Sequence, residues 1–360
     1  MPPETNDNGQ DVTWFDSVER VEEPELDDDI DLENYELATP EVTFEESIEA
    51  IEGEALSMQD LLGFNDISRK QVHELRSHWN ELEETKRATI AEVMLALAGD
   101  YSYGDFGRFF QVLLEDSNEI VRLHAANGAA LSEVPTLIKP LVELSENDPS
   151  ENVREATLRA LAPQVVGLDL GVVNDAQDEK RLMKLKSWAQ DESWPANLRA
   201  AALQSYSYNV GDDDIGAIIE SFVESDDDTL QLGAMRAMIE FGPGAFTRFL
   251  ERELRSQDVD AREAAALAMG QSTDEAVVPM LTMAAREDQE PMVREAAYTA
   301  LGNIGSRAAI NSLTQLRENA SDDEIDVIES SLQYAAELQE LENLEEIGMF
   351  EFDSESDDDE

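Results

Sequence analysis

Hydrophobic and polar positions in the middle of the chain follow a pattern typical of paired amphipathic helices. In DQEPMVREAAYTALGNIG (Asp288 to Gly305), apolar residues recur at steps of four, four and three from Val293 to Ile304. This spacing places them on one stripe of a 3.6-residue helix. A second amphipathic stretch, AVVPMLTMAARED, comes just before it. The pattern therefore predicts one helix, a short turn and a second helix.

Weaker copies of the same phrase occur along the chain. When they are aligned on the central Val-Arg pair or its substitute, the second members are Arg122, Arg154, Arg199, Gln231, Arg262, Arg294 and Asp326. Their intervals are 32, 45, 32, 31, 32 and 32 residues. Self-similarity with a period of about 20 to 50 residues marks repeat arrays. We therefore expect one long all-α array in which each unit contacts its neighbours.

The ends of the second helices carry their own signals. Acidic or serine-rich stretches precede them and are expected to cap the first turn: Asp116-Ser117, Asp148-Pro149-Ser150, Asp226-Asp227-Asp228 and Ser321-Asp322-Asp323. Small residues such as Ala296 and Ala300 flank the apolar stripe and allow a neighbouring helix to approach closely. Gly302 and Gly305 are predicted to end the helix, because glycine adopts the left-handed conformation found there.

The two-helix unit resembles a HEAT repeat, in particular the PBS-lyase-like branch of that family. The resemblance rests on the pattern Asp-x4-Val-Arg-x2-Ala-x3-Leu in DSNEIVRLHAANGAAL and DQEPMVREAAYTAL, and it covers residues 57–341. It implies a right-handed α-solenoid of about eight repeats. The long interval implies about 13 additional residues, an insertion near residues 164–180.

The resemblance also implies a structural role for the Asp and Arg positions of the pattern. In HEAT proteins such residues commonly link neighbouring turns, which would apply to Asp288 with Arg294 and to Asp258 with Arg262. Gln231 and the aligned Asp326 depart from this pattern. We therefore expect a ladder of links that is interrupted at those two repeats.

The charge balance is strongly acidic, with 82 Asp or Glu against 25 Lys or Arg and a net charge of -57. Charge runs and few apolar residues predict disordered acidic segments at residues 1–56 and 342–360. Direct nucleic-acid binding is disfavoured, because that affinity depends on Lys and Arg releasing counterions. The acidity has three open interpretations: basic partners, including mimicry of nucleic acid; solubility; and adaptation to high salt.

The sequence offers little that resembles a catalytic or membrane-spanning protein. It has no cysteine, no apolar run of about 18 residues and no secretory leader pattern, so we expect a cytoplasmic protein. His73 and His78 lie five residues apart, whereas zinc-binding histidines on one helix face lie four apart. The multiple His-Glu pairs of deoxyhypusine hydroxylase are absent, and no residue matches bilin-lyase chemistry. We therefore expect no enzyme activity, metal or cofactor.

Candidate binding residues lie in three groups. One row on the second helices, expected to line a concave surface, consists of Asn127, Arg159, Gln204, Arg236, Glu295 and Thr299. A basic cluster beside the insertion consists of Lys180, Arg181, Lys184 and Lys186. Aromatic docking motifs in the acidic ends consist of Trp14 and Phe15, and of Met349, Phe350 and Phe352.

Each group retains an alternative interpretation. The row on the second helices is also consistent with a solvated face that binds no partner. The basic cluster is also consistent with a tolerated loop or with a clamp for the chain's own acidic ends, and the aromatic motifs with solubilising tails. The predicted function is a non-catalytic protein-binding scaffold or assembly factor with protein partners. The alternatives are a subunit of a HEAT-like enzyme, of the bilin lyase or deoxyhypusine hydroxylase type, or an acidic nucleic-acid mimic that binds basic proteins.

Overall fold

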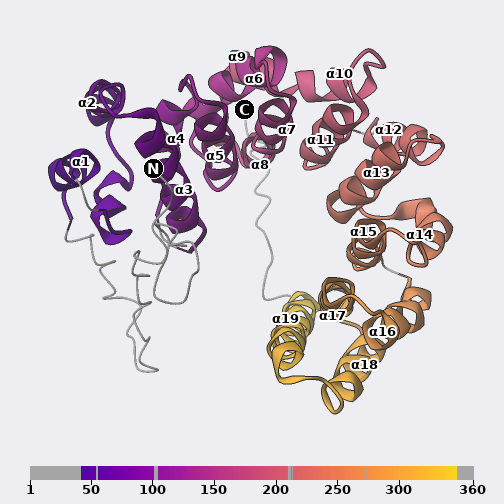
Figure 1. The fold of residues 1–360 in the computed structure, drawn as a ribbon. Helices are drawn as coiled ribbons and strands as arrows, with labels where there is room; N and C mark the ends of the chain where they lie inside the picture. Colours follow the sequence, from indigo (N-terminus) through magenta and orange to yellow (C-terminus); the bar gives the residue numbers. More distant parts are fainter. Residues whose placement is uncertain are drawn as a thin grey trace, which may run out of the picture. The chain divides into compact units, whose positions relative to one another are not determined.

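The computed structural model describes residues 42–53, 56–100, 104–209, 212, 214–272 and 274–346. These residues form α-helices and short 3-10 helices joined by turns, and no strand occurs among them (Figure 1). The chain divides into two compact units, Met1–Ser187 and Trp188–Glu360, so that the division falls within α10 (Lys184–Gln190). The predicted all-α repeat architecture is confirmed.

Unit 1 contains three helix pairs of the predicted kind, with further elements before and after them. The pairs are α2 (Arg69–Trp79) with α3 (Glu84–Asp100), α4 (Gly107–Leu113) with α5 (Glu119–Ala129), and α6 (Ile138–Asn147) with α7 (Glu151–Arg159). The other elements are α1 (Phe44–Glu52), η3 (Gln59–Phe64), η4 (Pro135–Leu137), α8 (Ala162–Asp169) and α9 (Ala176–Leu182).

Unit 2 begins with α11 (Ala196–Tyr206) and continues as four helix pairs. They are α12 (Ile215–Val223) with α13 (Asp228–Phe241), α14 (Thr247–Glu253) with α15 (Val259–Met269), α16 (Val278–Glu287) with α17 (Pro291–Ile304), and α18 (Arg307–Arg317) with α19 (Asp322–Glu346). The 3-10 turns η5 (Gly244–Phe246) and η6 (Glu275–Val277) precede α14 and α16. The second helices pack against one another in one layer, and the first helices form the other layer (Figure 1).

Helix starts are set by the local chemistry that the sequence signals, with one shift. Ser150 caps α7 and Asp227 caps α13 by accepting hydrogen bonds from backbone N–H groups of the first turn, as predicted. At α5, however, the cap is Asn118, whereas the predicted Asp116 lies two residues before it. Asp116 is instead buried and accepts a hydrogen bond from Trp79 at 2.7 Å.

Small residues set the distance between the second helices. A Cβ atom on Gly302 would lie 2.9 Å from the carbonyl oxygen of Ser331, and one on Gly270 would lie 2.8 Å from the Cα atom of Ala300. Gly302 therefore lies inside α17 to admit α19, and the prediction that it ends the helix is wrong. Gly305 alone ends α17, with a φ of 60°.

The boundary of the predicted acidic N-terminal arm needs correction. The structure has α1 within it, with a capping box formed by Thr43 and Glu46, and Phe44 and Ile51 on its buried face. Phe44 packs against Phe64 of η3 with ring centroids 5.8 Å apart. The acidic composition concealed an apolar stripe of Phe44, Ile48 and Ile51, spaced by four and three residues, which is sufficient to fold this segment against its neighbour. The rest of the arm, residues 1–41, lies outside the described residues.

The structure also has helices at the predicted insertion and at the predicted end of the array. Residues near the predicted insertion form α8 and α9, and α9 packs against α6. The helix α19 continues to Glu346, five residues beyond the predicted end of the array. Residues 347–360 of the predicted tail lie outside the described residues.

Candidate protein-interaction surface

Four of the aligned positions in the sequence pattern occupy the same place in their second helices. Arg122, Gln231, Arg262 and Arg294 each lie four residues after the N-cap of their helix. Each donates a side-chain hydrogen bond to the carbonyl oxygen of the residue two positions before that N-cap, at distances from 2.6 to 3.0 Å. This bond fixes the turn between the two helices of the repeat.

Arg122, Arg262 and Arg294 also bind a carboxylate of the next repeat, as does Arg87 in the first turn of α3. Arg87 binds Asp116 at 2.7 Å, Arg122 binds Asp148 at 2.7 Å, Arg262 binds Asp288 at 2.8 Å, and Arg294 binds Glu324 at 2.7 Å. The predicted ladder exists, but its side-chain partners differ from those expected. Asp288 pairs with Arg262 of the preceding repeat and offers only its backbone carbonyl to Arg294, while Asp258 caps α15.

These links perturb the ionisation of both partners. Hydrogen bonding to Asp148 raises the pKa of Arg122, and hydrogen bonding from Arg262 lowers the pKa of Asp288. Hydrogen bonds from Ser321 and then Arg294 hold the pKa of Glu324 at about 2. Burial, followed by the charge of Glu324, raises the pKa of Tyr298 to about 12. The ladder therefore consists of ionised, hydrogen-bonded pairs that lie between repeats and serve packing.

The predicted binding row lies on the second helices and contains its own charge compensation. Asn127, Arg159 and Thr299 are exposed, whereas Gln204, Arg236 and Glu295 are partly buried. Arg159 forms an ion pair with Glu155 at 2.6 Å within α7. Arg236 of α13 interacts electrostatically with Glu263 of α15, whose pKa is raised mainly by burial. Arg159 is thus paired with a carboxylate, whereas Arg236 has only a longer-range interaction with one.

One part of this row is hollowed into a groove. Between α17 and α19 a groove of about 290 Å³ is lined by Thr299, Asn303, Val327, Ser330, Ser331 and Tyr334. The close approach at Gly302 brings the two helices together along its floor. Its lining is uncharged, although the protein as a whole is strongly acidic. Sequence analysis placed Thr299 on this face but gave no signal for Asn303 or Tyr334.

The groove contains polar groups that no other described residue uses. Ser330 and Ser331 donate to carbonyl oxygens of their own helix at 2.9 and 2.8 Å. The side chains of Thr299, Asn303 and Tyr334 make no hydrogen bond within the described part of the chain. Tyr334 is 48% exposed, which leaves both its ring and its hydroxyl accessible. Such rings are frequent anchors in protein interfaces.

The other candidate groups are less informative in the structure. Lys180 is exposed on α9, Arg181 pairs with Asp178, and Lys184 pairs with Glu146 at 2.8 Å. Lys186 is partly buried on α10. The predicted docking residues Trp14, Phe15, Met349, Phe350 and Phe352 lie outside the described residues.

Two of the histidines lie on α2 and the third lies on α5. His78 of α2 contacts Glu52 of α1 at 2.6 Å, and His73 is exposed. His124 is partly buried on α5, and burial lowers its pKa. Its Nδ1 atom has no hydrogen-bond partner within the described part of the chain.

A scan against protein families decides the classification. The model described as HEAT repeats matches residues 108–207 and 246–333, which together make up more than half of the chain. This chain belongs to the HEAT-repeat family. HEAT repeats commonly mediate protein interactions. No curated protein sequence matches the chain.

Solved HEAT-like structures resemble the chain at low identity. YibA of Escherichia coli is 15% identical, with a TM-score of 0.38, and the match covers 75% of this chain and 98% of YibA. Human deoxyhypusine hydroxylase, solved in complex with glycerol, is 18% identical, with a TM-score of 0.33 and coverage of 76% and 96%.

The second of these structures corrects an expectation from the sequence. Deoxyhypusine hydroxylase is an enzyme, and the prediction that this chain is not an enzyme is contradicted. The match does not transfer an activity at this identity. With regard to membranes, no helix among the described residues has the length and apolar character needed to cross a bilayer.

Proposed function

We infer that the chain binds protein partners along the face formed by its second helices, and thereby acts as a scaffold or assembly factor. The observation that carries this proposal is the uncharged groove between α17 and α19. It offers three side chains with unused hydrogen-bonding groups and an exposed tyrosine ring. A partner segment that fills it can satisfy these groups and bury the ring.

The division of labour within the second helices supports the same proposal. The arginine ladder and the small residues hold one repeat against the next, so they are committed to packing. Thr299 lies on the same helix as Arg294 but is exposed and makes no such contact. Residues that do not hold the array together are the ones available to bind a partner.

Affinity capture from the native cell with matched variants tests this proposal. Thr299→Arg places a long charged side chain in the groove, and Tyr334→Ala removes its exposed ring. Thr314→Arg is the control, because Thr314 is also an exposed threonine but lies on the first helix α18, outside the groove. A protein captured by the wild type and the control, and lost with both groove variants, supports the proposal. Equal capture by all four proteins contradicts it.

The two arginines of the predicted row, Arg159 and Arg236, need a separate test of partner binding. Arg159→Glu and Arg236→Glu together reverse the charge at two arginines, of which Arg159 forms an ion pair with Glu155 and Arg236 interacts electrostatically with Glu263. If these arginines contribute to partner binding, the double variant should lose the same protein. Unchanged capture would remove them from the proposed surface and leave the α17/α19 groove as the binding site.

A further inference from the structure

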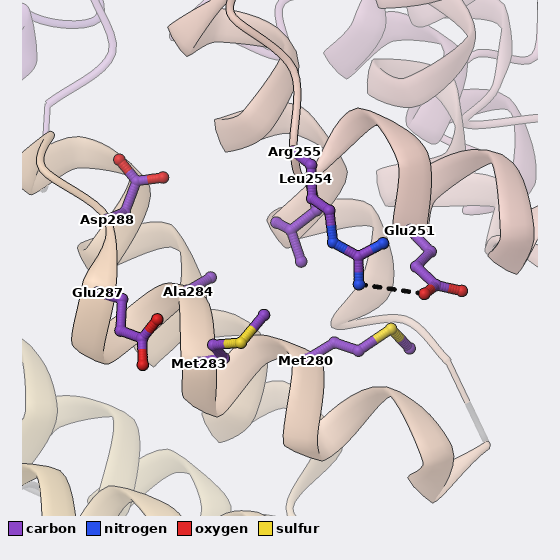
Figure 2. Close-up of a pocket in the computed structure, with 8 residues that line it drawn as sticks. All are labelled: Glu251, Leu254, Arg255, Met280, Met283, Ala284, Glu287 and Asp288. Carbon is purple, nitrogen blue, oxygen red and sulfur yellow. Dashed lines mark hydrogen bonds and ion pairs between the residues drawn. The ribbon is translucent and has the colours of Figure 1, made fainter.

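A second hollow lies on the opposite layer of unit 2, between first helices. Figure 2 shows Met280 and Met283 of α16 facing Leu254 and Arg255 at the end of α14. Together with Ala284 they line a groove of about 160 Å³. We call this space the methionine groove.

The methionine groove continues past Met283 towards α18. An adjoining hollow of about 550 Å³ lies on the other side of Met283, and its lining includes Val278, Pro279, Thr282 and Ala308. Met283 and Glu287 border both hollows. Met283 is 44% exposed, an unusual position for a large apolar side chain at the centre of a surface depression. Methionine is flexible and polarisable, so it adapts to different apolar partners.

Four acidic residues line the two hollows, Glu251, Glu275, Glu287 and Asp288, against two arginines, Arg255 and Arg286, so the rim is acidic on balance. Glu287 and Glu275 are exposed, and neither carboxylate has an ion-pair partner within the described part of the chain. Glu251 is paired with Arg255 at 3.2 Å (Figure 2). Residues 188–346 contain 33 Asp or Glu against 10 Arg and no Lys, so the surrounding field is strongly negative as well.

Charge selects the occupant of this groove. The chain's own C-terminal sequence, DSESDDDE, would be repelled by Glu287, Glu275 and the field around them. A second copy of the chain, with a net charge of -57, would be repelled as well. A segment with apolar residues next to lysine or arginine matches both the floor and the rim.

We propose that the methionine groove is a docking site for a basic, amphipathic segment of another protein. An apolar side chain of that segment lies against Met280 and Met283, and its lysine or arginine side chains lie against Glu287 and Glu275. This site goes beyond the proposed function, because it lies on first helices and uses none of the residues of the α17/α19 groove.

Fluorescence anisotropy with labelled synthetic peptides tests the site on the full chain. The probes are a twelve-residue peptide of leucine and lysine in helical amphipathic order, the same peptide with glutamate in place of lysine, and residues 347–360 of this chain. The protein variants are Met283→Gln and the matched control Met292→Gln, because Met292 on α17 is 41% exposed and lies outside the groove. Both changes keep a helix-forming side chain of similar length.

The expected result is binding of the lysine peptide alone, about tenfold weaker with Met283→Gln and unchanged with Met292→Gln. Glu287→Lys should weaken binding further, and Thr299→Arg should leave it unchanged, which separates this site from the proposed function. Equal affinity of Met283→Gln and wild type would overturn the proposal, because binding would then be diffuse attraction between charges. Absence of binding, or equal binding of the glutamate peptide or residues 347–360, would also overturn it.

Discussion

Two junctions between neighbouring repeats of unit 2 differ in the side chains that join their second helices. Between α15 and α17, Arg262 binds Asp288 of the next repeat. Between α13 and α15, Gln231 and Ser256 occupy the corresponding positions, and no ion pair joins them in the described structure. Gln231 keeps the bond to its own repeat, to the Ser225 carbonyl at 2.6 Å. At the α13/α15 junction the hydrogen bond within the repeat is thus kept, although the ion pair between repeats is absent.

The acidic residue before each cap has two roles that this comparison separates. Asp288 accepts a hydrogen bond from the backbone N–H of Glu290 and also binds Arg262. Ser256 accepts the equivalent bond from the N–H of Asp258, and its short hydroxyl stops there. Serine preserves the turn, and only aspartate reaches the neighbouring repeat. The difference teaches that helix capping and repeat coupling are independent functions of one position.

The largest effect is expected where the ladder is most buried. The side chains of Arg122 and Asp148 are 10% and 1% exposed. Arg122→Ala should lower the free energy of unfolding by about 3 to 5 kcal/mol, because it leaves a buried carboxylate without its cation. Gln231→Ala, at the junction without an ion pair, should cost about 1 kcal/mol. Urea denaturation with hydrogen exchange on α5, α7 and α13 measures both, and equal losses would contradict the comparison.

A smaller loss is expected at the α15/α17 junction. Asp288→Asn keeps an oxygen for the Glu290 N–H group and removes the charge that Arg262 binds. We expect a loss of about 1 to 3 kcal/mol, seen as faster hydrogen exchange in α15 and α17. Asp274→Asn is the control, because Asp274 caps η6 by a bond to Ala276 and has no arginine partner among the described residues. Similar exchange in both variants would show that the ion pair adds nothing.

Acid should weaken the α17/α19 junction in a defined range. The pKa of Glu324 is about 2 in the folded chain, against an ordinary value of 4.5. Its stabilising contribution is therefore complete above about pH 4.5 and is lost as the pH falls towards 2. Glu324→Gln should be less stable than wild type by about 1 to 2 kcal/mol near neutral pH, with the gap closing in acid. A gap that is independent of pH would refute this.

The smallest expected effect comes from building the missing link. Gln231→Arg with Ser256→Asp should place an ion pair between α13 and α15, with a coupling energy of about 0.5 to 1 kcal/mol. The two single variants complete a double-mutant cycle measured by urea unfolding. Additive effects would mean that these helices hold the two positions too far apart for the pair to form.

Much of the repeat architecture could be predicted from local patterns. The stripe around Val293 and the caps at Ser150 and Asp227 depend on residues within a few positions of one another, and the structure confirms them. The ladder was expected, but its partners were not, because Arg262 and Asp288 lie 26 residues apart in different repeats. The acidic composition around α1 predicts disorder, whereas its capping box and short apolar stripe form a helix.

The candidate surfaces were only partly predictable. Helical periodicity places Thr299 opposite the packed stripe, but it does not reveal which neighbouring helix borders it. Asn303 and Tyr334 join Thr299 only because Gly302 lets α19 approach α17. Met283 lies on an ordinary amphipathic helix, and its position between two hollows is visible only in the folded structure.

The sequence by itself determined the period of the array, and the helical character and buried apolar stripe of its regular repeats. These properties depend on contacts within one or two turns, so they are written in local spacing. Only the tertiary structure decided which acid each arginine binds, which glycine ends a helix and which admits a neighbour, and where grooves remain. Those outcomes depend on distances between helices. A periodic pattern is nearly the same in every repeat, so it cannot predict how these distances differ, whereas the packing of individual side chains sets each one.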